Sequence, residues 1–134
     1  MKHLFLFEDF SKENIMYHAT DGVNVQSILK DGLLVSDKKR WSQNEYPKGI
    51  YLFNDRDSAL RYAVLYCDDG EVLQINVQNI NLKKDPESTI GSHFEDSESF
   101  YATDNIPPEQ IKWLRISKEE KDDIYRQYEN FKII

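Results

Sequence analysis

The sequence has little cysteine, glycine or proline, and it lacks long apolar runs. The single cysteine, Cys67, excludes an intramolecular disulfide framework, and no cysteines or histidines show the spacing of a zinc site. No apolar run approaches the roughly 20 residues that a membrane-spanning helix needs. We therefore expect a soluble domain with no metal and no membrane partner.

Basic residues are also in deficit. The chain has 17 lysines and arginines against 24 acidic residues, and its net charge is −7. Because phosphate contacts dominate nucleic-acid affinity, this balance opposes a large nucleic-acid footprint. A nucleotide ligand is still compatible with it, since such a ligand needs only a local cationic spot.

Ordinary catalytic motifs are missing as well. The sequence has no G-x-S-x-G, P-loop, G-x-G-x-x-G or H-E-x-x-H pattern. The first ten residues, MKHLFLFEDF, contain an apolar stretch that Glu8 and Asp9 interrupt, and no cleavage site follows it. This pattern argues against a secretory leader, so we expect a cytoplasmic protein.

Hydrophobic periodicity predicts short strands over 15–19, 49–53, 71–77, 99–102 and 112–116. The third of these alternates apolar and polar residues, which predicts one buried face. One helix is expected to end at Gly32, a second to begin at Asn54 or Asp55, and a last one to be capped by Ser117 with Glu120 in the capping box. Residues 36–48 and 83–97 are expected to be loops. Without regular βαβ alternation, the fold class is α+β.

An ordered series of short motifs is the most informative feature of the chain. MYHAT precedes a helix that ends in DGLL, KGIYLF leads into the helix DSALRYA, and GEVLQINV and SFYATDNIPPEQIKWLRI follow. This succession, over residues 15–116, resembles the compact ADP-ribosyltransferase superfamily. That superfamily includes poly(ADP-ribose) polymerases, DarT-type toxins and RNA 2′-phosphotransferases. The resemblance implies an α+β fold with two small packed antiparallel or mixed sheets and short helices, and NAD as co-substrate.

The resemblance also implies roles for individual residues. His18 would bond the adenosine ribose of NAD, with Thr20 as a second polar contact beside it. Tyr51 would stack on nicotinamide, and Tyr62 would close the same pocket. The imidazole of His18 and the two phenol rings would therefore line one cleft that holds the dinucleotide. Arg40, the last residue of the basic cluster Lys38-Lys39-Arg40, would meet the pyrophosphate.

General chemistry favours such a set independently. The nicotinamide of NAD is an aromatic cation, and the electron-rich face of a tyrosine is a good platform for it. Cleavage of the nicotinamide–ribose bond passes through an oxocarbenium-like state, as in glycoside hydrolysis. Hydrogen bonds to the ribose hydroxyls that strengthen in that state lower the barrier.

The catalytic acid is the position at which the sequence departs from the family pattern. Counting back from Ile106 puts the family's acid at Ser99, one residue after Glu98. We take Glu98 as the first choice for the catalytic acid, which would act together with His18 and Tyr51. Glu95 and Glu109 are weaker choices for this acid. A one-residue slip reverses the face of a strand side chain, so only a bulge would restore Glu98 to the slot.

Three other interpretations remain open. An RNA 2′-phosphotransferase-like enzyme would need no such acid and would grip an RNA phosphate with Arg40, Arg56 or Arg61. A non-catalytic protein would bind NAD, ADP-ribose or a host protein as an inhibitor. In a small domain that matches by chance, His18 would be a structural histidine and Tyr51 and Tyr62 would fill the core.

Residues 1–13 precede the resemblance and are expected to be an N-terminal extension of a single domain, 14–134. Their alternating apolar residues indicate a strand or helix that packs on this domain, and a second interpretation rests on a resemblance. Their sequence, MKHLFLFEDFSKE, is similar to the leader peptides that send proteins into the heads of T4-like bacteriophages. By this resemblance, the protein would be packaged in the phage head and act in the host cytoplasm on a protein or nucleic-acid acceptor.

Overall fold

The structure is a computed structural model that describes residues 14–35, 49–84 and 99–133, with side chains as far as residue 129. Several predictions fall outside these ranges. They are the N-terminal extension 1–13 and the site residues Lys38, Lys39, Arg40, Glu95 and Glu98.

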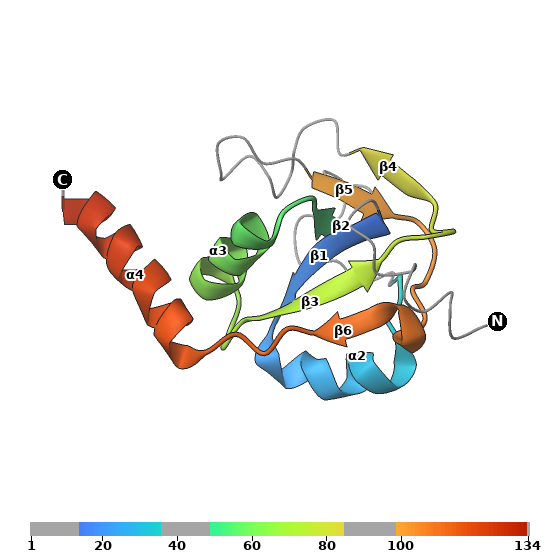
Figure 1. Cartoon of the computed structure of the whole chain (residues 1–134), viewed down its shortest axis with the longest axis horizontal. Coiled ribbons are helices and arrows are strands. Elements are labelled where there is room, and N and C mark those ends of the chain that lie inside the picture. The colour runs from blue at the N-terminus through green and yellow to red at the C-terminus, as the bar shows by residue number, and fades with distance from the viewer. Residues whose placement is uncertain (1–13, 36–48, 85–98, 134) are drawn as a thin grey trace.

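Six strands form one sheet in the described part of the chain (Figure 1). They are β1 (Ile15–Thr20), β2 (Ile50–Phe53), β3 (Glu71–Asn76), β4 (Leu82–Lys84), β5 (Ser99–Ala102) and β6 (Ile111–Trp113). Their order is β4-β5-β2-β1-β3-β6, and every neighbouring pair is antiparallel. The α+β class is confirmed. The predicted loop over 83–97 is wrong at its start, because β4 includes residues 83 and 84.

The prediction of two sheets is wrong, because β1 is paired along both edges and so joins the two halves. All of β1 pairs with β3, from Ile15↔Asn76 to Thr20↔Glu71. On its other edge β1 has one registered pair with β2, Tyr17↔Phe53. We call this junction of β1 with β2 the seam. Beyond that pair, the end of β1 and the start of β2 have no further registered pairs with each other.

The described helices and 3-10 turns connect the strands as the sequence predicts. They are η2 (Gly22–Asn24), α2 (Val25–Asp31), α3 (Arg56–Tyr66), η4 (Pro108–Gln110) and α4 (Lys118–Ile133). Gly32 ends α2 as predicted: its φ is 87°, and its N–H donates to the Ile28 carbonyl at 2.8 Å. A left-handed φ of this kind strongly favours glycine.

Asp55 caps α3, which confirms one of the two predicted candidates. Its carboxylate accepts a hydrogen bond from the Ser58 N–H at 2.9 Å. We expect Asp55→Ala to lower the free energy of unfolding by about 1 kcal/mol, the usual cost of losing an N-cap. Urea denaturation checks this, with Asp57→Ala in the exposed first turn as the matched control. A loss no greater than that of the control would contradict the cap.

Helices cover both faces of the sheet. Ile28 of α2 packs with Leu52, Leu73 and other residues on one face, while residues of α3 pack with Phe53 and Val72 on the other. β3 is therefore buried on both faces, and the prediction of a single buried face is wrong. The alternation of apolar and polar residues predicted an exposed polar face, but the polar residue Asn76 is only 2% exposed.

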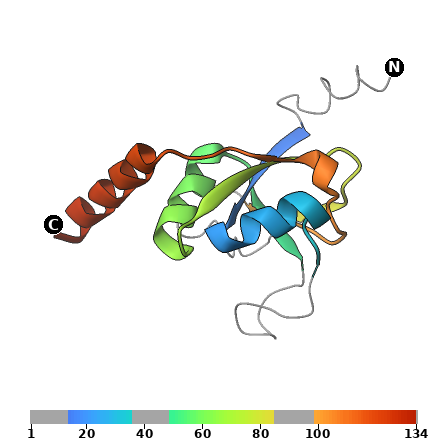
Figure 2. The same cartoon turned by 90° about the horizontal axis from the view of Figure 1, so that it is seen from below.

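The last helix, α4, extends from the body of the domain, as both views show (Figures 1 and 2). The Ser117 hydroxyl accepts from the Glu120 N–H at 3.1 Å, so half of the predicted capping box is present. The Glu120 carboxylate pairs with Arg56 of α3, with Nη2–Oε distances of 3.2 Å. In the described part of the chain, no helix is both long and apolar enough to cross a membrane.

Candidate functional site

His18 bridges the seam. Its Nδ1 lies 2.9 Å from the carbonyl oxygen of Tyr51 in β2. Because a carbonyl only accepts hydrogen bonds, Nδ1 must carry the proton and donate it. In the neutral imidazole the other nitrogen, Nε2, is then an acceptor. The ring is half-buried, so a protein backbone group fixes both its orientation and its tautomer.

The carbonyl of Tyr51 bonds to a side chain because β1 and β2 have no backbone pairing at this position. Tyr51 and Tyr101 are direct partners in the β2–β5 ladder, and the carbonyl of Tyr51 is directed toward β1. Buried backbone carbonyls almost always find a donor. Here the imidazole of His18 supplies it, so the bond ties the two halves of the sheet where the ladder is not continued.

The predicted ligand-binding residues divide between the two faces of the sheet. Tyr17 and Ala19 pack with the α3 cluster, so strand alternation puts the side chains of His18 and Thr20 on the α2 side. Tyr51 and Tyr62 pack with the α3 cluster. The structure therefore brings His18 to the backbone of Tyr51 and places their rings on opposite faces. The expectation that the imidazole and the two phenol rings line one cleft is wrong, because successive strand side chains alternate between the faces of the sheet.

The four described residues that were predicted to bind NAD also differ in solvent exposure. Tyr51 and His18 are half-buried, whereas Thr20 is 5% and Tyr62 9% exposed. The Tyr62 ring is flanked by Phe53, at 5.6 Å between centroids, and by Tyr66, at 5.1 Å. Tyr62 therefore lies in the core.

The predicted acids remain without a described position, apart from Glu109. Glu109 is exposed on η4, on the chain segment that leads into β6. Ser99, at the slot where the family pattern has its acid, is 1% exposed and lies opposite Phe53 in the β2–β5 ladder. A buried hydroxyl cannot act as a carboxylate, and the predicted acid Glu98 lies outside the described residues.

Arg56 and Arg61 lie in acidic surroundings. Arg56 pairs with both carboxylate oxygens of Glu120. Arg61 lines a hollow of about 220 Å³ between α3 and α4, together with Asp57, Glu120 and Asp123. A phosphate that binds Arg56 would therefore compete with the carboxylate of Glu120.

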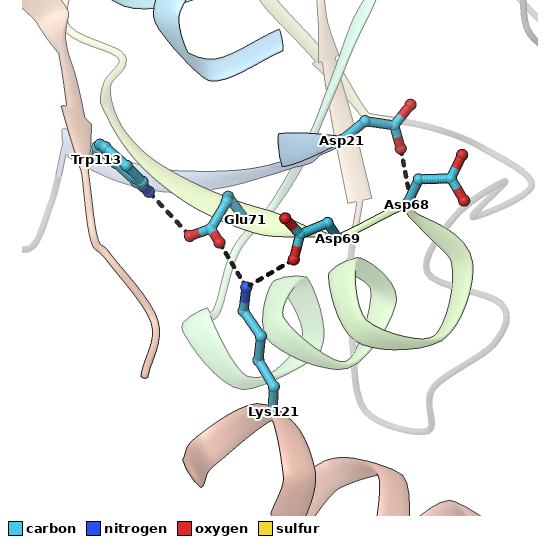
Figure 3. A network of polar contacts seen from close by, with 6 residues as sticks. All are labelled: Asp21, Asp68, Asp69, Glu71, Trp113 and Lys121. Carbon is cyan, nitrogen blue, oxygen red and sulfur yellow. Dashed lines mark hydrogen bonds and ion pairs between the residues drawn. The ribbon is translucent and has the colours of Figure 1, made fainter. Parts of the chain in front are cut away.

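A network at the start of β3 went unpredicted (Figure 3). The Glu71 carboxylate accepts from Trp113 Nε1 at 2.9 Å and from Lys121 Nζ at 2.5 Å. Lys121 also lies 3.7 Å from an oxygen of Asp69. No periodicity in the sequence links residue 71 with residue 121. Only the burial expected for a strand residue could have indicated that Glu71 needs a cation.

This network fixes α4 to the sheet. The side chain of Glu71 is 12% exposed and that of Lys121 19%. Glu71 lies opposite Thr20 in the β1–β3 ladder, at the end of the strand that carries His18. In the residues that the structure describes, no group of three or more metal-binding side chains is present.

No protein-family model matches the sequence, and a search of curated proteins finds no match to it.

Proposed function

We propose that the protein is an NAD-dependent mono-ADP-ribosyltransferase that modifies a protein or nucleic-acid acceptor. The observation that carries the proposal is the hydrogen bond from His18 Nδ1 to the Tyr51 carbonyl. It fixes the orientation and the tautomer of a half-buried histidine, as the binding of a ribose by this side chain would require. The motif order and the α+β fold support the same conclusion.

NAD would bind around the end of the sheet at which β1 ends and β2 begins. Its adenosine ribose and its nicotinamide lie at opposite ends of the dinucleotide, so their two contacts do not need to share a face. The adenosine ribose would meet His18 on one side and nicotinamide would meet Tyr51 on the other. Arg40, on the chain that leads toward β2, would neutralise the pyrophosphate.

In the reaction the bond between nicotinamide nitrogen and ribose C1′ breaks, and its electron pair leaves with neutral nicotinamide. An oxygen or nitrogen of the acceptor attacks C1′ and loses its proton to a base, for which Glu98 is the candidate. Charge develops on the ribosyl ring, so fixed hydrogen-bond acceptors around it stabilise the transition state. Specificity for the acceptor would come from the surrounding loops.

The test is incubation of the purified protein with adenine-labelled NAD and a bacterial lysate. We expect release of nicotinamide and transfer of label to a macromolecule. Protease and nuclease digestion then identify the acceptor class. Consumption of NAD only with a 2′-phosphorylated RNA would favour the phosphotransferase alternative. If nicotinamide is not released under any of these conditions, the proposal is wrong.

A further inference from the structure

The aromatic ring beside Tyr51 belongs to Tyr101. The two residues are direct partners in the β2–β5 ladder, and their ring centroids lie 5.7 Å apart at an interplanar angle of 40°. Both side chains are half-buried. Tyr62, the residue that the family pattern assigns to this place, is 9% exposed and packs between Phe53 and Tyr66.

Gly49 makes this arrangement possible. A Cβ atom at this position would lie 2.9 Å from Cδ2 of Tyr101 and 2.9 Å from the Ala102 carbonyl oxygen. Real Cβ atoms do not approach other heavy atoms so closely, so any larger residue would push the ring of Tyr101 away. Because Gly49 has no side chain, the ring of Tyr101 can lie directly against the backbone of Gly49, just before β2 begins.

We propose that Tyr101, and not Tyr62, is the second aromatic ring of the nicotinamide-binding platform. This inference rests on the proposed function. Two tilted phenol rings at this separation present adjacent electron-rich surface, which attracts a flat cation such as the pyridinium ring of NAD. Once the glycosidic bond breaks, nicotinamide is neutral and the attraction falls, which favours its departure.

Steady-state rates of nicotinamide release against NAD concentration test the proposal. We expect Tyr101→Leu to raise KM by about tenfold without lowering kcat, because the cation is present in the bound substrate. Tyr101→Phe keeps the ring and should stay within about twofold of the wild type. Gly49→Ala, which displaces the ring, should raise KM as Tyr101→Leu does.

Tyr62→Leu is the matched control, because it removes a tyrosine ring from the same face of the sheet. We expect it to lower the melting temperature and to leave KM unchanged in the folded fraction. If Tyr62→Leu raises KM and Tyr101→Leu does not, the inference is overturned and the proposed function stands. If the wild type neither binds nor cleaves NAD, the proposed function fails and the inference with it.

Discussion

We expect His18→Asn to raise KM for NAD by about tenfold while the protein stays folded, because the lost contact is to the adenosine ribose, away from the bond that breaks. The amide nitrogen of asparagine occupies nearly the place of Nδ1, so it can still donate to the Tyr51 carbonyl across the seam. The acceptor at Nε2 is lost. Loss of one hydrogen bond to the substrate, with a net value of about 1 kcal/mol, costs a factor approaching this size. Rates of nicotinamide release against NAD concentration, with circular dichroism to check folding, provide the test.

His18→Gln is the matched variant, because it removes the other half of the imidazole. Its amide oxygen reaches the place of Nε2, while the donor to the Tyr51 carbonyl is lost. We expect its KM for NAD to stay closer to that of the wild type than the KM of His18→Asn does, and its free energy of unfolding to be lower by about 1 kcal/mol, the usual net value of one hydrogen bond. Equal KM values in the two variants would show that the imidazole only ties the strands together.

The largest effect on stability is expected from Lys121→Met. The variant leaves the carboxylate of Glu71 largely buried with the Trp113 N–H as its remaining donor from the network. Breaking a fully buried ion pair costs about 3–5 kcal/mol. Lys121 keeps 19% of its side chain exposed, so water relieves part of that cost. We therefore expect a loss of about 2–3 kcal/mol in urea denaturation.

Lys118→Met is the control for that measurement, since Lys118 is exposed one turn earlier on α4. Its effect should stay within about 0.5 kcal/mol. Adding Glu71→Gln to Lys121→Met removes the unpaired charge and should restore part of the lost stability. A loss in Lys121→Met no larger than that of the control would mean that the ion pair does not hold α4.

Local features of the fold were predictable because they depend on neighbours in sequence. Asp55 accepts from an N–H three residues away, and Gly32 ends its helix at a left-handed φ, so each feature depends on a few consecutive residues. Pairings between distant segments left no such pattern. The single registered pair Tyr17↔Phe53 is enough to make one sheet out of two halves, and nothing in the alternation of either strand indicates it.

The candidate site shows the same division. The sequence motif singled out His18, which bridges β1 and β2 in the structure. Its partner, the Tyr51 carbonyl, could not be predicted, because every residue has a backbone carbonyl. The resemblance implies a pocket role for Tyr62, and the structure places this residue in the core. The contacts of Tyr51 with Tyr101 and of Glu71 with Lys121 were not predicted, because they form between strands and between a helix and the sheet.

A crystal structure of the protein with bound NAD tests the central claim most directly. We expect a hydroxyl of the adenosine ribose within about 2.6–3.2 Å of His18 Nε2, while Nδ1 keeps its bond to the Tyr51 carbonyl. The nicotinamide ring should lie against Tyr51 on the other side of the seam. NAD bound away from the seam, or a donor of the protein itself on His18 Nε2 in that complex, would contradict the account.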